Sequence, residues 1–499
     1  MIASALWLAL LAGGAAGAEP AAATRPAESW RLLGTLRPRH AREIRSSPWS
    51  VGAETMGRDY TIYRHWREHL GPLGVKRARI QAGWAKTERR RGVYDWAWLD
   101  EIIPDMVDQG VEPWVCLCYG NPIYPLGGGT GLGGGLPSSP QALAAWDAFV
   151  AAFVKRYGKY VREWEVWNEA NLRGKSSAGG YGDLLIRTAE IVRGVQPKAR
   201  ILGIAAPGVG TSFVRAVLEH LKARGKLHLL DEVTYHPYSA NPDSSYPAVA
   251  GLRKVVAGYD GRIGIRQGEN GAPSRRGSFG ALSQYNWTER RQAKWALRRL
   301  LGDRGRDIPS SYFAICDMAY RVGKGGRDSD ARDDRGQVRL KVNTKGLLAI
   351  RDDRTVHHVK EAYRAVQHVT AIFDDTLRRI DGFAAGIEPP GKISAFAYEK
   401  GSGGPAVVTV WRGDRMPSND LARSPVTLTC PAGRFDEAVY VDMLSGEVFT
   451  MPAAHVTRTA GRWVFRRIPV GDWPVLIAAR AAIGKLNRPA APPGGAAGR

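Results

Sequence analysis

Two glutamates at the ends of predicted strands are the residues of this chain best suited to chemistry. Aromatic and β-branched residues predict a strand over 163–169 that ends in the pair Asn168 and Glu169. An amide beside a carboxylate offers hydrogen bonds to a polyhydroxylated ligand, and the carboxylate can donate or accept a proton. A second carboxylate, Glu269, ends a predicted strand that begins at Ile263, three strand-helix units further along the chain.

Such a pair of carboxyl groups fits the hydrolysis of glycosides. Hydrolysis with retention of configuration requires two carboxyl groups about 5 Å apart, one as acid and base and one as nucleophile. The C-terminal ends of strands four and seven of a closed barrel can converge on one site. We therefore interpret Glu169 and Glu269 as a catalytic pair, and this chemistry requires no metal and no organic cofactor.

Strands and helices alternate from Trp49 to Phe373, which predicts an α/β fold built as a (β/α)8 TIM barrel. The predicted strands are 49–53, 76–81, 112–118, 163–169, 199–205, 232–236, 263–269 and 312–316. The predicted helices are 59–70, 96–108, 142–157, 181–195, 212–223, 248–258, 289–301 and 356–373. Short alternating runs separated by Gly, Pro and Asp then predict a C-terminal antiparallel β-sandwich domain.

The predicted domains are a catalytic barrel over 49–376 and the β-sandwich over 377–482. A disordered tail is predicted for 483–499, and a partly disordered segment for 19–48 that could add a strand to a neighbouring domain. Residues 1–18 are small and apolar and end in Ala16-Gly17-Ala18, which indicates a signal peptide and a secreted or periplasmic protein. No later run is long and apolar enough for stable membrane insertion.

Composition suggests further properties of the chain. Its 71 Lys and Arg against 48 Asp and Glu give a formal charge of +23, which could favour an acidic polysaccharide or an anionic envelope surface, or reflect an arginine-rich composition. Nucleic acid is not expected as a partner, because no binding motif is present and export removes the usual target. We interpret the four cysteines as small buried hydrophobic residues.

Two loops could have a function or be simple surface segments. The glycine-rich stretch 127–135 follows the third predicted strand and could be a flap over the substrate or a flexible surface loop. The acidic stretch 328–334 lacks the spacing, the glycine and the closing glutamate of an EF-hand, which favours a solvated charged loop over a calcium site.

Polar and aromatic residues near other strand ends could serve the two carboxylates. His236 and Tyr238 could fix the rotamer of a nucleophilic carboxylate and keep it ionised. Arg79 could lower the pKa of that carboxylate, or form a salt bridge at the barrel end. Trp84 could stack on a sugar ring, as could Tyr119, Tyr124 and Trp167, or these rings could simply pack in the core.

The barrel, from about Trp49 to Phe373, resembles clan A glycoside hydrolases and is most similar to family 39. The motifs that carry the resemblance are Arg79-Ile80-Gln81 with Trp84, Gly120-Asn121-Pro122, Trp167-Asn168-Glu169-Ala170-Asn171-Leu172, Tyr235-His236-Pro237-Tyr238 and Gly268-Glu269-Asn270. Family 39 also carries a β-sandwich beside its barrel.

The resemblance implies a role for each matching residue. Glu169 would be the acid and base, Glu269 the nucleophile, and Asn168 the donor to the sugar 2-hydroxyl. Arg79, His236 and Tyr238 would support the nucleophile. Together with Trp84, Asn121, Asn168 and Asn270, these three make up the predicted substrate-binding set.

The sequence thus predicts an exported retaining glycosidase that acts on an oligosaccharide or polysaccharide. The alternatives are a non-catalytic carbohydrate-binding protein on a glycosidase-like barrel, and a polysaccharide lyase acting on uronates. A separation of the two carboxyl groups well beyond about 6 Å would favour the binding protein or an inverting enzyme.

Overall fold

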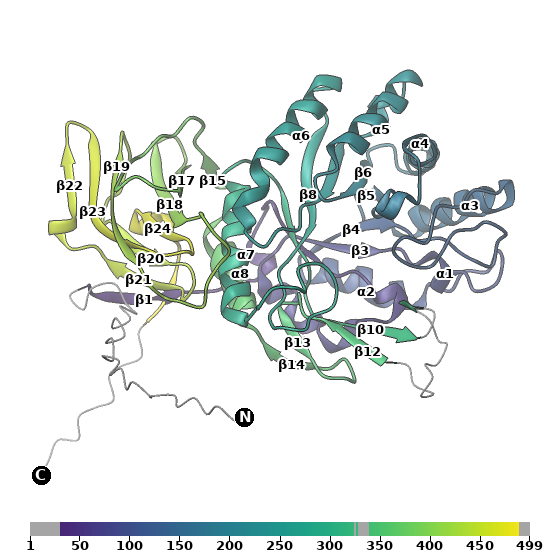
Figure 1. Ribbon diagram of the computed structural model, residues 1–499, viewed down its shortest axis with the longest axis horizontal. Helices are drawn as coiled ribbons and strands as arrows, with labels where there is room; N and C mark the ends of the chain where they lie inside the picture. Colours follow the sequence, from purple (N-terminus) through teal and green to yellow (C-terminus); the bar gives the residue numbers. More distant parts are fainter. Residues whose placement is uncertain (1–29, 324–325, 328–338, 489–499) are drawn as a thin grey trace, which may run out of the picture.

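A closed barrel of eight parallel strands forms the centre of the computed structural model, which describes residues 30–323, 326–327 and 339–488 (Figure 1). The barrel strands are β2 (Trp49–Gly52), β3 (Arg77–Gln81), β4 (Glu112–Leu117), β5 (Glu163–Val166), β6 (Arg200–Pro207), β7 (Glu232–His236), β8 (Gly264–Asn270) and β9 (Ser310–Tyr312). Each strand pairs with the next one along the chain, and β9 closes the barrel against β2. The predicted (β/α)8 barrel is confirmed.

Helices cover the outside of this barrel. They are the short α1 (Trp84–Thr87), α2 (Ala97–Asp108), α3 (Pro140–Tyr157), α4 (Ala178–Val195), α5 (Thr211–Ala223), α6 (Tyr246–Tyr259), α7 (Glu289–Arg304) and α8 (Glu361–Ile372). The side chains of Ser139 and Ser177 cap α3 and α4 by accepting a hydrogen bond from a backbone N–H of the first turn. Each cap of this kind stabilises its helix by about 1 kcal/mol.

The predicted helix over 59–70 is wrong, because this segment folds as 3-10 turns. They are η2 (Met56–Arg58), η3 (Tyr63–His65), η4 (Arg67–His69) and η5 (Gly71–Leu73). Asp59 has a left-handed backbone (φ 56°) and Trp66 has φ −132°, so neither residue continues an α-helix. The predicted final helix also begins too early, since Val356–Val359 is strand β14 and the helix starts at Glu361.

Two small antiparallel sheets lie in the connection between the last barrel strand and α8 (Figure 1). One contains β10 (Met318–Gly323), β11 (Gly326–Arg327) and β12 (Arg339–Asn343), and the other β13 (Leu348–Ile350) and β14. This connection follows the C-terminal end of a barrel strand, where active sites of such barrels lie. The acidic stretch 328–334 lies outside the described residues.

The C-terminal region is a β-sandwich of two antiparallel sheets. The larger sheet has the order β15 (Leu377–Arg379), β17 (Ile393–Lys400), β18 (Pro405–Arg412), β24 (Val475–Ala478), β20 (Val439–Asp442), β21 (Glu447–Thr450), β1 (Leu32–Leu36) and β25 (Leu486–Asn487). The smaller has the order β16 (Gly386–Glu388), β19 (Ser424–Cys430), β23 (Arg462–Val470) and β22 (Val456–Thr459). The segment before the barrel therefore adds a strand to the sandwich, and part of the predicted tail forms another strand. Residues 1–18 lie outside the described residues.

Helices α7 and α8 lie between the barrel and the sandwich (Figure 1). Two buried basic residues of α7 form ion pairs at this junction: Lys294 Nζ lies 2.5 Å from an Asp472 oxygen, and Arg298 Nη2 lies 2.6 Å from Asp243 Oδ2. The indole of Trp411 donates to the other oxygen of Asp243 (2.9 Å). Buried charges are stable only when they are paired, so these contacts fix the sandwich against the barrel.

Two further properties concern the described part of the chain. Its four cysteines are free and buried, which agrees with their interpretation as small hydrophobic residues. Among the described helices, none combines the length and the apolar character that a membrane span requires.

An ion-pair network closes the barrel interior at the N-terminal ends of the strands. Arg266 donates to both oxygens of Glu163 (2.6 and 2.8 Å), and its Nε lies 2.6 Å from a Glu232 oxygen. Burial by itself would raise the pKa of Glu163. The positive charges around it, Arg266 first and then Arg77 and Arg200, outweigh burial and lower this pKa to about 2.

We expect Glu163→Ala to lower the free energy of unfolding by about 3–5 kcal/mol, because it leaves Arg266 charged and buried with one partner fewer. Urea unfolding at neutral pH measures this loss. Glu112→Ala, at the exposed start of the neighbouring strand, is the control and should change stability by less than about 0.5 kcal/mol.

The pH dependence of stability gives a second readout for Glu163. The pKa of Glu163 in the folded protein lies below its ordinary value of 4.5. Ionisation of Glu163 therefore stabilises the fold above pH 4.5, and this contribution is lost as the pH falls toward 2. The free energies of unfolding of wild type and Glu163→Gln should therefore become more similar as the pH falls. Equal loss of stability in the Glu163 and Glu112 variants would contradict this account.

Candidate active site

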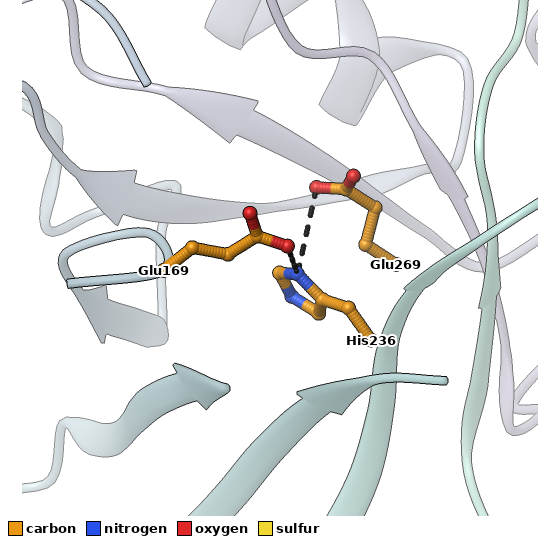
Figure 2. A group of neighbouring side chains, drawn as sticks. All are labelled: Glu169, His236 and Glu269. Carbon is orange, nitrogen blue, oxygen red and sulfur yellow. Dashed lines mark hydrogen bonds and ion pairs between the residues drawn. The ribbon is translucent and has the colours of Figure 1, made fainter. Parts of the chain in front are cut away.

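The structure brings the two predicted carboxylates together at the C-terminal end of the barrel (Figure 2). An oxygen of Glu169, an oxygen of Glu269 and Nδ1 of His236 all lie within 4.8 Å of one another. Both carboxylates point toward the imidazole that lies between them. This separation suits a retaining pair, whose carboxyl groups lie about 5 Å apart.

A strained turn after β5 aims Glu169 into the barrel mouth. The strand ends at Val166, and both Trp167 (φ 63°) and Glu169 (φ 48°) have left-handed backbones, which are rare in residues other than glycine. The barrel edge holds this turn, since the N–H of Trp167 donates to Leu117 O (3.0 Å) and that of Glu169 to Ala205 O (3.2 Å). Such strain persists only where the surrounding structure imposes it.

A bulge in β8 positions Glu269. Gln267 pairs with Ser310 and Asn270 with Tyr312, so β8 has one more residue than β9 over this interval. The amide oxygen of Gln267 accepts a hydrogen bond from the N–H of Ser311 (2.9 Å). Bulges of this kind redirect side chains, and here the result is that Glu269 lies at the mouth of the barrel.

Hydrogen bonds hold both oxygens of Glu269. Tyr238 donates its hydroxyl to Oε1 (2.8 Å), and Arg79 donates Nη1 to Oε2 (3.2 Å). Burial, followed by the charge of Glu269 and the hydrogen bond to it, raises the pKa of Tyr238 well above its ordinary value, so this hydroxyl remains a donor. These contacts fix the orientation of the Glu269 carboxylate at the mouth of the barrel.

Arg79 is completely buried and supports Glu269 instead of binding a ligand directly. Its guanidinium donates to Glu165 Oε2 (2.6 Å), Asn168 Oδ1 (2.8 Å), Glu54 Oε1 (2.9 Å) and Glu269 Oε2 (3.2 Å). Burial alone would lower its pKa. The negative charge around it, above all that of Glu165, reverses this effect, so Arg79 stays charged. Arg79 thus contacts the predicted nucleophile, and its complete burial leaves no surface for the substrate contact that the sequence analysis also predicted.

Glu54 is a member of the site that sequence reasoning missed. It follows β2 by two residues, and burial raises its pKa to about 7, an effect that Arg79 opposes and Glu269 reinforces. Three carboxyl groups therefore share one guanidinium, those of Glu54, Glu165 and Glu269. A Cβ at Gly52 would lie 2.3 Å from Glu54 Oε2, so glycine leaves room for this carboxyl group.

His236 contacts Glu169 more closely than Glu269. Its Nδ1 lies 2.8 Å from Glu169 Oε1 and 3.8 Å from Glu269 Oε2. Burial would lower the pKa of His236, but the charges of Glu269 and Glu169 outweigh burial and raise it. His236 therefore contacts both carboxylates, with its hydrogen bond to the predicted acid and a longer contact to the predicted nucleophile.

Three predicted substrate-binding side chains are structural. Trp84 is fully buried, donates to Glu88 Oε2 (2.6 Å) and packs against other aromatic rings. Asn121 is also fully buried and donates to the backbone oxygen of Glu88 (2.8 Å). Asn270 donates to Pro237 O (2.8 Å) and fixes the turn that follows β7. These side chains shape the loops of the site but have no surface for a sugar.

A cavity of about 340 Å³ opens over the catalytic pair. Tyr238, Phe313 and Tyr320 provide aromatic lining, and Asn343 and Lys345 provide polar lining from the connection after β9. Leu132 of the glycine-rich stretch also lines this cavity, which places that loop over the site as the flap interpretation required. The cavity is within the size range of small-molecule sites.

The donor atoms of Glu169, His236 and Glu269 are close enough to bind a divalent cation as well as to perform acid and nucleophile chemistry. A cation bound to both carboxylates would occupy the position that the reacting sugar requires.

We expect Glu54→Gln to change the pH dependence of stability. The pKa of Glu54 in the folded protein, about 7, lies above its ordinary value of 4.5. Between these two pH values the folded protein therefore binds more protons than the unfolded chain. The contribution of Glu54 to the free energy of unfolding of wild type should fall by up to about 3 kcal/mol as the pH rises from 4.5 to 7. The Gln variant should show no such loss. Denaturant unfolding across this pH range measures the free energy of unfolding of both proteins. The same dependence on pH in wild type and in Glu54→Gln would contradict the prediction.

Comparisons with known proteins agree with this geometry. Residues 73–258 match the family model for glycosyl hydrolases family 39. A sequence search among curated proteins finds no match. Among solved structures, a family 39 glycoside hydrolase from Bacteroides cellulosilyticus WH2 is similar over 87% of this chain and 81% of its own, with 18% identity and a TM-score of 0.62.

Two other solved structures share the fold. A monomeric β-xylosidase from Caulobacter crescentus CB15 is 18% identical, with 90% of this chain and 97% of its own covered and a TM-score of 0.55. A GH39 enzyme from Xanthomonas axonopodis pv. citri is 16% identical, with 89% and 95% covered and a TM-score of 0.54. The predicted resemblance to family 39 of clan A is confirmed by the match over residues 73–258, and the solved structures show that the chain shares the fold of these glycoside hydrolases.

Proposed function

We propose that this chain is a retaining glycosidase that acts by double displacement, with Glu169 as acid and base and Glu269 as nucleophile. The observation that carries the proposal is the separation of the two carboxylates, whose oxygens lie within 4.8 Å of each other. Their surroundings differ in the way the two roles require. Glu269 accepts hydrogen bonds from Arg79 and Tyr238, whereas Glu169 is hydrogen-bonded to His236.

In the first step the ionised Glu269 attacks the anomeric carbon of the sugar. A bond forms between a Glu269 oxygen and this carbon while the bond to the leaving oxygen breaks, and Glu169 donates a proton to that oxygen. The product is a covalent glycosyl ester on Glu269 and a free leaving group. The attack neutralises the charge of Glu269, which favours the ionised form of Glu169 that the second step requires.

In the second step Glu169 removes a proton from water, whose oxygen attacks the anomeric carbon and releases Glu269. His236 is fully buried and hydrogen-bonded to Glu169 Oε1, so it fixes the orientation of that carboxylate in both steps. We assign His236 as a positioning residue and as a reservoir for the proton of Glu169.

Asn168 is oriented to bind the substrate. Its oxygen accepts from Arg79 Nη2 (2.8 Å), and one N–H donates to the hydroxyl of Tyr119 (2.8 Å). An amide nitrogen has two N–H donors, so one remains for the 2-hydroxyl of the sugar. Hydrogen bonds to that hydroxyl strengthen in the transition state of glycoside hydrolysis.

The substrate we propose is a glycan that presents one sugar to the cavity over the pair. β-Xylosides are the first choice for assay, because one structurally similar protein is described as a β-xylosidase. Export by the apolar segment 1–18 would deliver the enzyme to polysaccharides outside the cell.

The geometry also bears on the alternatives. A binding protein would have no need to hold two carboxylates within 4.8 Å of each other with different hydrogen-bond partners. A lyase acting on uronates would need a base and a group that neutralises the sugar carboxylate, rather than a second carboxylate beside the base.

Hydrolysis of an aryl-glycoside panel tests the proposal, with xyloside, glucoside, galactoside, arabinoside and uronides as substrates. We expect wild type to release the aglycone from at least one sugar, and Glu269→Ala to be at least about 10³-fold slower. Glu169→Ala should be about 10²–10⁴-fold slower than wild type, and its loss of rate should be smallest for aglycones that leave without protonation. Glu112→Ala, at the exposed start of β4, is a matched control and should keep the wild-type rate.

Azide can distinguish the two roles. In Glu169→Ala, azide should restore turnover and give a glycosyl azide of retained configuration, because it attacks the covalent intermediate. In Glu269→Ala, the azide product should have the inverted configuration. Undiminished turnover by a clean Glu269→Ala preparation would reject the nucleophile assignment, and unsaturated products absorbing in the ultraviolet would indicate a lyase.

A further inference from the structure

A second cavity lies beside the catalytic one and has a different chemical character. It has a volume of about 280 Å³ and is lined by residues from η2 and from the ends of β3 and β4. Arg58, Lys86 and Arg89 are its cations, and Asp59 is its acidic residue. Neither the predicted site nor the proposed mechanism uses these side chains.

The charges in this cavity are incompletely paired. Lys86 Nζ lies 2.6 Å from Asp59 Oδ1 and also donates to Met56 O (3.0 Å), so these two charges compensate each other. Arg58 and Arg89 have no carboxylate partner in the described ranges 30–323, 326–327 and 339–488. Two positive charges therefore remain at the cavity.

Arg58 is held in place with unused donors. Its Nη2 donates to Gln81 Oε1 (3.0 Å), and Nη1 has no hydrogen-bond partner among the residues described. The guanidinium carbon lies 4.7 Å from the ring centroid of Tyr60 and 5.1 Å from that of Tyr119. Contacts with two aromatic rings fix the plane of the guanidinium, and a fixed guanidinium with free donors matches the geometry of an oxyanion.

This cavity adjoins the catalytic centre through two shared elements. The hydroxyl of Tyr119, which also lines the second cavity, accepts a hydrogen bond from Asn168, the neighbour of Glu169. The glycine-rich loop contributes Thr130 to the second cavity and Leu132 to the catalytic one. The second cavity is therefore linked to the catalytic centre through Tyr119 and through the glycine-rich loop.

We propose that this second cavity, which we call the Arg58 subsite, binds a carboxylate or sulfate group on a sugar adjacent to the one that is cleaved. The proposal rests on the glycosidase function and adds a class of substrate to it, the anionic glycans. The formal charge of +23 would add long-range attraction for such polymers.

Matched pairs of substrates test the Arg58 subsite. One pair is a galacturonate oligosaccharide and its carboxyl-reduced form, and the other is a sulfated galactan oligosaccharide and its desulfated form. We expect wild type to favour the charged member of one pair by at least about tenfold in kcat/KM. Which pair shows the preference distinguishes carboxylate from sulfate.

Arg58→Gln removes the charge and retains a side chain that can hydrogen-bond to Gln81. We expect this variant to lose most of the charge preference, and Arg89→Gln to lose less because Arg89 is exposed. Arg462→Gln, at an exposed position of the sandwich strand β23, changes the net charge equally and should keep the wild-type preference. No preference in wild type, or the same preference in Arg58→Gln, would overturn the proposal.

Direct binding separates this proposal from the proposed function. Titration calorimetry with the same oligosaccharides on Glu269→Gln, with and without Arg58→Gln, needs no turnover. Selective binding of the charged member that depends on Arg58, together with no hydrolysis of any substrate by wild type, would reject the glycosidase and retain the subsite. Hydrolysis by wild type, together with equal binding of the charged and the neutral members, would retain the glycosidase and reject the subsite.

Discussion

The buried guanidinium of Arg79 is the interaction on which both the barrel and its site depend. It contacts carboxylates that follow β2 and lie on β5 and β8, so one cation joins three parts of the barrel wall. An unpaired charge in this interior would be costly, so the barrel can close only in an arrangement that supplies these partners. That arrangement also fixes one oxygen of Glu269 and the amide of Asn168, and the fold and the catalytic geometry therefore have a common origin.

The two ends of the barrel interior use charge differently. At the N-terminal end, Arg266 is matched by Glu163 and Glu232, and the lowered pKa of Glu163 shows that its negative charge is fully compensated. At the C-terminal end, carboxyl groups outnumber cations, and the pKa of Glu54 rises to about 7. A site with excess negative charge suits a reaction whose transition state resembles an oxocarbenium cation. Charges are thus paired at one end of the barrel, whereas carboxyl groups are in excess at the other.

The sequence predicted the features that periodicity and short motifs encode. The bounds of β7 agree with the predicted 232–236, and the two carboxylates meet as strands four and seven of a barrel should. The helix over 59–70 could not be excluded, because its apolar spacing is helical and the interruption lies in the backbone of Asp59, Ile62 and Trp66. The direction of side chains at the strand ends could not be predicted from the sequence either. Trp84 and Asn121 face the protein interior, whereas Glu54, which resembles Glu169 in position, faces the site.

The excess of carboxyl groups at the mouth has a consequence for the substrate. A neutral sugar approaches this centre without electrostatic cost, but a sugar that carries its own anion is repelled unless a cation lies near that anion. Such a cation must lie outside the ring of carboxylates, since a cation within it would pair with Glu169 or Glu269. Arg58 meets this condition, because Tyr119 and Asn168 separate it from the catalytic pair while the glycine-rich loop spans both cavities. The same barrel mouth can therefore perform a reaction that requires negative charge and still accept an anionic glycan.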